Sequence, residues 1–201
     1  MNYSIIYADP CWRYADQKNN DPAMGGITYP TMTVAELSAL PVGDLAAKDC
    51  ALFCWATWPL MQEALLVIEA WGFTYTTCGF CWVKLNPSGV GWYSGLGHWC
   101  NGNTEACLFA KRGRPQRVAK NVKQLVLAPR GRHSAKPPEV RNRIVQLMGD
   151  LPRVELFARE RCDGWSCWGS EVDSDLVLEA GQWRKTGGVH GLRGGAGSYR
   201  G

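Results

Sequence analysis

The chain has 201 residues, enough for one domain that buries a core without disulfide or metal cross-links. Its composition, 46% hydrophobic and 11% aromatic, is typical of a globular protein, and no apolar run is long enough to predict a membrane span. The first residues run directly into an apolar strand, so we expect no signal peptide. Nine cysteines, scattered and odd in number, favour reduced thiols and a cytoplasmic location over a disulfide framework.

Positive charge is concentrated in one central block, although the whole chain has a net charge of only +4. Residues 111–143 carry eleven Lys and Arg against one acid, Glu139, whereas acids outnumber bases in the segments on both sides. Such a block predicts a surface that binds a polyanion such as nucleic acid, with a merely solvated face as the alternative. The side chains most expected to contact phosphates are Lys111, Arg112, Arg114 and Arg117.

Apolar periodicity and turn residues predict strands that alternate with helices. Strands are expected over the ranges 3–8, 51–55, 73–84, 105–110, 121–127 and 153–158. Helices are expected after a capping box at 33–36, after a cap at Thr57, and from Pro137. This alternation predicts an α/β sheet covered on both faces, with ligands bound beyond the carboxyl ends of the strands. Residues 1–182 are expected to form one domain, and the Gly-rich segment 183–201 a disordered tail.

The most informative motif, Asp9-Pro10-Cys11-Trp12, directly follows the first strand. The exocyclic NH2 of a base offers two protons, and the Asp9 carboxylate and Pro10 carbonyl are acceptors that could hold both. Trp12 supplies an aromatic face on which an extruded base could stack, with core packing as the alternative for this ring. We therefore predict that Asp9, Pro10 and Trp12 are catalytic residues of an enzyme that modifies an amino group.

One Cys-x-x-Cys pair, Cys78 and Cys81, could mark a zinc or redox module, which is a rival from another functional class. No second Cys or His pair stands at zinc spacing, and the motif falls inside a predicted strand. We therefore expect no metal and interpret both cysteines as small buried hydrophobes.

Six segments, in this order, resemble the N6-adenine methyltransferase family that includes the catalytic subunit of the eukaryotic messenger-RNA adenine methyltransferase and compact bacterial and phage members. These segments are 8–12, 29–32, 97–99 with Asn101 and Glu105, 133–137, 154–159 and 164–171. Two positions depart from the family pattern: Cys11 replaces the usual second proline, and Ser170 stands where some relatives carry Asn. The resemblance implies a Rossmann-like methyltransferase fold in the permuted order, with the catalytic motif ahead of the segments that bind S-adenosylmethionine.

The resemblance also implies roles for individual residues. In the two long loops it implies substrate contacts for Tyr29, His98 and Trp99, with a hydrogen bond inside the loop as the alternative for His98. Cofactor contacts are expected from Asp9, His133, Lys136, Glu155, Arg159 and Glu171. For Arg159 the alternative is a surface ion pair with Glu160 or Asp163. The rings of Trp165 and Trp168 either pack near the adenine of the cofactor or fill the core.

Together these patterns predict an S-adenosylmethionine-dependent adenine N6-methyltransferase that acts on nucleic acid. DNA is favoured over RNA because the chain has the compact form of bacterial and phage members. The first rival is a catalytically silent relative that binds nucleic acid or a partner subunit. Methylation of RNA adenine or of cytosine N4 is a further alternative. We expect no membrane partner, and the sequence leaves open a homodimer or a partner subunit.

Overall fold

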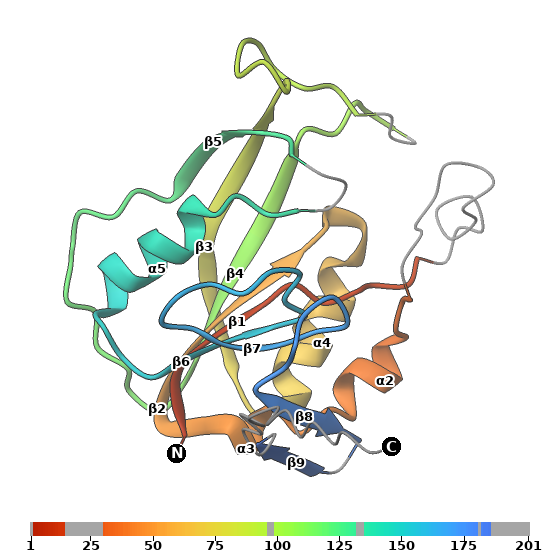
Figure 1. The fold of residues 1–201 in the computed structure, drawn as a ribbon. Coiled ribbons are helices and arrows are strands. Elements are labelled where there is room, and N and C mark those ends of the chain that lie inside the picture. Colours follow the sequence, from red (N-terminus) through yellow and green to blue (C-terminus); the bar gives the residue numbers. More distant parts are fainter. Residues whose placement is uncertain (1, 15–29, 96–98, 132–134, 181, 186–201) are drawn as a thin grey trace, which may run out of the picture.

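A computed structural model of the chain describes residues 2–14, 30–95, 99–131, 135–180 and 182–185. A seven-stranded mixed sheet forms its centre, in the order β5-β3-β4-β2-β1-β6-β7, with a separate hairpin of β8 and β9 (Figure 1). The strands are β1 Tyr3–Ala8, β2 Ala46–Ala56, β3 Thr74–Leu85, β4 Thr104–Arg112, β5 Leu125–Pro129, β6 Arg153–Leu156, β7 Ser166–Trp168, β8 Leu176–Glu179 and β9 Gln182–Lys185. The helices are α2 Val34–Ser38, α3 Val42–Leu45, the 3-10 turn η2 Trp58–Leu60, α4 Met61–Ala70 and α5 Glu139–Met148.

Strand β1 lies inside the sheet, between β2 and β6 and parallel to both. It is apolar on both sides, as a strand with two covered faces must be. Ile5 and Tyr7 pack into the core shared with α5, while Ile6 and Ala8 pack into the core shared with α2 and α4. Figure 1 shows α5 on one side of the sheet and α2 and α4 on the other. The predicted α/β sheet covered on both faces is confirmed.

Helices α2 and α4 begin and end for identifiable local reasons. The predicted capping box of α2 is present: the Thr33 N–H donates to the Glu36 carboxylate, and the Glu36 N–H donates to the Thr33 hydroxyl. Helix α4 ends before Gly72, whose φ of 79° favours glycine. Thr57 does not cap α4 as predicted, because η2 intervenes and the Thr57 hydroxyl instead accepts a hydrogen bond from the Tyr14 hydroxyl.

Strand β4 runs against its neighbours, whereas the other strands of this described sheet run in one common direction. The carboxyl ends of β1, β2, β3, β5, β6 and β7 therefore meet at one edge, together with the start of β4. We call this the carboxyl edge and the opposite one the amino edge. The far end of β4 lies at the amino edge, and this arrangement decides which predicted site residues can come together.

The boundaries at the end of the chain differ from prediction. Strand β9 pairs with β8, so the domain boundary predicted after residue 182 is wrong because it falls inside a strand. Residues 186–201, the rest of the predicted tail, lie outside the described residues. Within the described ranges, no helix is both long and apolar enough to cross a bilayer.

Candidate active site

Asp9 is the first residue after β1 and lies at the carboxyl edge. Its N–H donates to the carbonyl of Leu156, the last residue of β6, at 3.3 Å. Its carboxylate faces the ammonium of Lys136, whose Nζ lies 2.8 Å from Oδ1 and 2.9 Å from Oδ2. The Asp9 and Lys136 side chains are only 21% and 11% exposed, so water screens this ion pair less than it would at the surface.

The ion pair belongs to a chain of four alternating charges. Lys136 Nζ also lies 3.3 Å from Glu105 Oε2, and Lys84 donates to Glu105 Oε1 at 2.5 Å. Glu105 lies near the start of β4 and Lys84 near the end of β3, so the antiparallel pairing of these strands brings them together at the carboxyl edge. The order Lys84, Glu105, Lys136, Asp9 places a cation on each side of the Glu105 carboxylate and sets Lys136 directly against Asp9.

These contacts determine the charge states. Burial raises the pKa of Asp9, and the Lys136 ammonium opposes that shift. Burial lowers the pKa of Lys136, but the carboxylates of Asp9 and Glu105 outweigh burial and hold it above its usual range. Burial raises the pKa of Glu105, but Lys136 and Lys84 outweigh burial and hold it below its usual range. Asp9 is therefore a better proton acceptor than an exposed aspartate, and Lys136 stays cationic beside it.

The loop that follows Asp9 is held by backbone pairing with the segment at Met32. The Met32 N–H donates to the Cys11 carbonyl at 2.8 Å, and residues 12 and 32 form a parallel bridge. The Trp12 N–H donates to the Pro10 carbonyl at 2.9 Å, which leaves that oxygen one lone pair for another donor. This pairing restrains the backbone at Cys11, where the family pattern has a second proline.

The Trp12 ring is enclosed in the core. It is 6% exposed, packs in the core shared with α2 and α4, and donates from Nε1 to the Trp55 carbonyl at 3.1 Å. The prediction that Trp12 offers a stacking face for the target base needs correction, because the tertiary packing covers this ring. We propose that Trp12 instead anchors the loop that presents Asp9 and Pro10.

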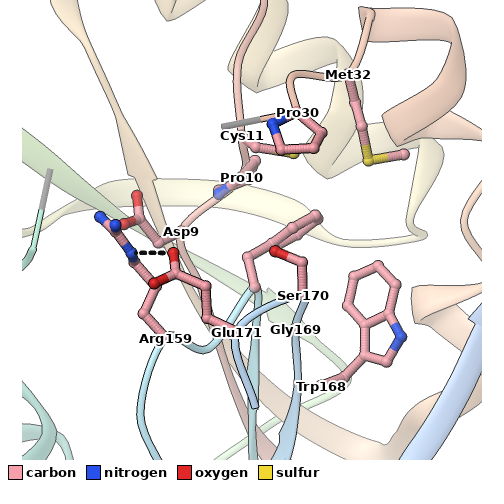
Figure 2. Close-up of a pocket in the computed structure, with 11 residues that line it drawn as sticks. Asp9, Pro10, Cys11, Pro30, Met32, Arg159, Trp168, Gly169, Ser170 and Glu171 are labelled. Atoms are coloured by element: carbon pink, nitrogen blue, oxygen red, sulfur yellow. Dashed lines mark hydrogen bonds and ion pairs between the residues drawn. The ribbon is translucent and has the colours of Figure 1, made fainter. Parts of the chain in front are cut away.

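A cavity of about 320 Å³ opens beside Asp9 (Figure 2). The loop after β1 forms one wall, and the segments after β6 and β7 form the other. Apolar faces come from Pro10, Met32, Phe157 and Trp168, whereas Asp9, Arg159 and Glu171 place charges together at one end. A smaller cavity of about 110 Å³ shares Asp9, Phe157 and Arg159 with the first and is also lined by Lys136, Arg141 and Glu155. The two cavities together suit a ligand with a flat ring at one end and charged groups at the other.

Two residues predicted to bind the cofactor, Arg159 and Glu171, are brought together at the larger cavity. Arg159 Nε donates to Glu171 Oε1 at 2.6 Å, as Figure 2 shows. The alternative named a surface pair with Glu160 or Asp163; Glu160 is paired with Arg141.

Glu155 is buried and fully engaged by an arginine. It is 6% exposed, and its two carboxylate oxygens accept from Arg141 Nε and Nη2 at 2.6 and 2.9 Å. Burial raises the pKa of Glu155, and Arg141 opposes this shift. Because Arg141 lies on α5 and Glu155 on β6, this pair fixes the helix against the sheet beside the smaller cavity.

The wall formed by β6 and β7 depends on two unusual backbone positions. Phe157 has a φ of 62°, which is strained for a residue with a side chain and is found mostly at functional sites. Gly169 lies so close to Ala158 that a Cβ there would sit 2.0 Å from the Ala158 carbonyl oxygen. The Phe157 ring meets the Trp168 ring edge-on at 5.1 Å. Trp168 thus lines the cavity, whereas Trp165 fills the core.

Four of the remaining predicted contacts lie in the loops. Tyr29, His98 and His133 lie outside the described residues, and their roles stay predictions. Trp99 is described and is 99% exposed in the connection between β3 and β4, which starts and ends at the carboxyl edge.

The four basic residues predicted to contact phosphates lie away from the carboxyl edge. All four are exposed. Lys111 and Arg112 end β4, where they pair with Ala51 and Cys50 of β2. Ala8, which precedes Asp9, is level with Leu108 of β4, so Lys111 lies about 10 Å further toward the amino edge. Because β4 is antiparallel, Lys111 and Arg112 lie toward the amino edge and not beside Asp9, and the phosphate contacts of all four residues stay a prediction.

Sequence reasoning gave no role to Lys84 or Glu105 and missed the strained Phe157. An acid inside an apolar strand, as Glu105 is, was the available signal, because a buried charge needs a partner.

Cys78 and Cys81 lie in β3 as half-buried free thiols whose pKa burial raises. Within the described part of the chain, no three His, Cys, Asp or Glu side chains are grouped to hold a metal ion.

Comparison with known proteins identifies the family of this chain. The MT-A70 family profile matches residues 3–171. The chain is 35% identical over 195 residues to the Type II methyltransferase M.MunI of Mycoplasma sp, which covers 87% of this chain and 80% of that protein. It is 28% identical over 183 residues to an Arabidopsis thaliana N(6)-adenosine-methyltransferase MT-A70-like protein, with 89% and 25% covered. It is 28% identical over 202 residues to the human N(6)-adenine-specific methyltransferase METTL4, with 89% and 40% covered.

The chain therefore spans most of the Mycoplasma relative but less than half of these two eukaryotic proteins. The family profile covers the strand before Asp9, the charge chain and both walls of the larger cavity. From its sequence and its mixed α/β fold, this chain belongs to the MT-A70 family of methyltransferases.

Proposed function

We propose that this chain transfers a methyl group from S-adenosylmethionine to the N6 amino group of adenine in nucleic acid, with DNA favoured over RNA. The observation that carries this proposal is the position of Asp9, which lies between the two cavities with its carboxylate held by Lys136. The names of the relatives support adenine as the base, because the Arabidopsis and human proteins are named for N6 methylation of adenosine or adenine.

The residues around both cavities fit S-adenosylmethionine. Phe157 and Trp168 give apolar faces for its adenine, and the Arg159–Glu171 pair offers a donor and an acceptor for its ribose hydroxyls. Lys136 and Asp9 offer opposite charges for its carboxylate and ammonium groups. When bound, the cofactor supplies a methyl group on a positively charged sulfur.

The chain's own residues would hold and orient the amine. An adenine N6 group is a weak nucleophile, because its lone pair is delocalised into the ring. Two acceptors that take both N6 protons would favour a pyramidal nitrogen, whose lone pair is localised for attack and no longer shared with the ring. The carboxylate of Asp9 keeps lone pairs beyond those facing Lys136, and the Pro10 carbonyl keeps one beyond the Trp12 N–H. Because burial raises the pKa of Asp9, this carboxylate is also suited to receive the proton that N6 releases.

The preference for DNA rests on similarity to the Type II methyltransferase. The chain is 35% identical to that protein and 28% identical to the Arabidopsis N(6)-adenosine-methyltransferase MT-A70-like protein. Nucleic acid is thus the proposed macromolecular partner. A partner subunit or a second copy of the chain is compatible with the proposal.

Transfer of labelled methyl from S-adenosylmethionine to duplex DNA, single-stranded DNA and RNA tests the proposal. Asp9→Asn keeps the shape of the side chain, removes its charge, and leaves Lys136 paired with Glu105. We expect transfer to fall by roughly 100-fold or more, the usual effect of losing a positioned proton acceptor. Asp44→Asn, at an exposed acid in α3, is the matched control and should retain full activity.

Undiminished transfer by the folded Asp9→Asn variant would contradict the proposal. Label found only in RNA would show that RNA, and not DNA, is the substrate. A wild-type protein that binds the cofactor and oligonucleotides but transfers nothing would favour the catalytically silent relative, with Cys11 as the departure to examine.

A further inference from the structure

Exposed tryptophan is confined to one edge of the described molecule. Of the ten tryptophans, all except Trp183 have described side chains. Three of these are exposed, Trp58 by 53%, Trp92 by 62% and Trp99 by 99%, while the others are buried or half-buried. Trp58 follows the end of β2, Trp92 bridges to Leu85 at the end of β3, and Trp99 lies on the way to β4. All three therefore lie on segments that leave the carboxyl edge, where Asp9 also lies.

The connection that carries Trp92 and Trp99 is held by backbone pairing among its described residues. Residues 85 and 92 form one bridge and residues 95 and 102 another, and the Tyr93 N–H donates to the Lys84 carbonyl at 3.0 Å. Figure 1 shows this connection extending past the ends of β3 and β4. Between residues 86 and 103 it contains no Asp, Glu, Lys or Arg, so it presents rings rather than charges.

Side-chain contacts position Tyr93 and Trp58 at the carboxyl edge. Arg130 follows β5, donates from Nη1 to the Tyr93 hydroxyl at 2.8 Å, and lies over the Tyr93 ring at 4.2 Å from its centroid. Trp58 donates from Nε1 to the Thr104 hydroxyl at 2.9 Å. Thr104 is the first residue of β4, so this hydrogen bond fixes the Trp58 ring at the carboxyl edge.

We propose that Trp58, Trp92 and Trp99, with Arg130 beside them, form a platform on which unpaired bases of a single strand stack next to the target adenine. This inference rests on the proposed function, because it extends the same site. A base must be unpaired before its N6 group can reach Asp9, and the neighbouring bases then have free faces. Indole rings stack on any base, and a nearby arginine suits the phosphate between them. Since Trp12 is enclosed in the core, these three rings are the exposed aromatic side chains that the described residues place at this edge.

Fluorescence anisotropy with a labelled single-stranded oligonucleotide, and with its duplex, tests the platform. Each of Trp58→Ala, Trp92→Ala and Trp99→Ala should weaken single-strand binding by about 5-fold to 100-fold, the range expected for one base–aromatic stack. The corresponding Phe variants should keep most of the affinity. Leu66→Ala, at a 58% exposed hydrophobic residue of α4, is the matched control and should bind like wild type.

The salt dependence separates stacking from charge. The tryptophan variants should bind more weakly at every salt concentration with an unchanged slope of log affinity against log salt, because no charge is removed. Arg130→Gln should instead reduce that slope by about 0.7, the value for one phosphate contact on a single strand.

Unchanged single-strand affinity in all three Ala variants would overturn the platform, even if the wild type methylates adenine. An equal loss of duplex affinity would also overturn it, because paired bases offer no free face. If the wild type transfers no methyl group but its single-strand binding depends on these rings, the platform stands and the proposed function fails.

Discussion

Replacing Lys136 with Met would remove the ammonium at the centre of the charge chain and keep an unbranched side chain of similar length. Asp9 would lose its contacts at 2.8 and 2.9 Å and would face the Glu105 carboxylate without the cation between them. Breaking a buried ion pair from one side costs about 3–5 kcal/mol. Because the Asp9 side chain keeps 21% exposure, we expect a smaller cost of about 2–3 kcal/mol.

The same substitution should change the pKa of Asp9. Lys136 opposes the burial that raises the pKa of Asp9, so removing Lys136 raises this pKa further. Since the reaction requires the Asp9 carboxylate, the acid limb of the pH–rate profile should move to higher pH. The loss of stability should be largest above neutral pH, where both Asp9 and Glu105 are charged, and smaller in acid, where Asp9 is protonated.

The assay is the pH dependence of kcat/KM for methyl transfer, together with urea unfolding at pH 5 and pH 8. Lys48→Met, at an exposed lysine near the amino edge, is the control and should leave both profiles unchanged. An acid limb that stays in place in the folded Lys136→Met variant would refute the claim that Lys136 controls the charge of Asp9. Lys136 would then act only on the cofactor.

Two further predictions concern the supports of the site. Gly169→Ala would place a Cβ 2.0 Å from the Ala158 carbonyl oxygen, so we expect a loss of about 2–3 kcal/mol in urea unfolding. Gly102→Ala, which meets nothing within 4 Å, should change stability by less than about 0.5 kcal/mol, and equal effects would contradict the close-approach argument. Thr33→Ala removes the capping box of α2 and should cost about 1 kcal/mol. An unchanged unfolding midpoint would show that the cap contributes nothing.

Much of the fold could be predicted from local pattern. The continuous apolar run of β1 indicated a strand covered on both faces, and its end located Asp9 at the edge where ligands bind. The spacing of Val140, Ile144 and Met148 likewise predicted the buried face of α5. Strands β7, β8 and β9 were not predicted, because three or four residues show no clear period. Strand β6 is equally short but was recognised within the longer run 153–158.

Some features of the site could not be predicted, because a local sequence pattern specifies neither the direction of a strand in the sheet nor the tertiary packing around a side chain. Nothing within β4 specifies that it runs antiparallel, yet that direction carries Lys111 and Arg112 away from Asp9. An aromatic residue beside a catalytic acid suggests stacking, but the packing of α2 and α4 encloses the Trp12 ring. The positive φ of Phe157 is imposed by its surroundings and has no sequence signature. The permuted order of the segments stays a prediction.

The central claim is that Asp9 and Pro10 present an adenine N6 amine for methyl transfer. Digestion of treated oligonucleotides to nucleosides, followed by mass spectrometry against standards, tests it most directly, with Asp9→Asn run in parallel. We expect N6-methyladenine from the wild-type protein, dependent on S-adenosylmethionine, and almost none from the variant. N4-methylcytosine as the product, or N6-methyladenine formed equally by the variant, would contradict it.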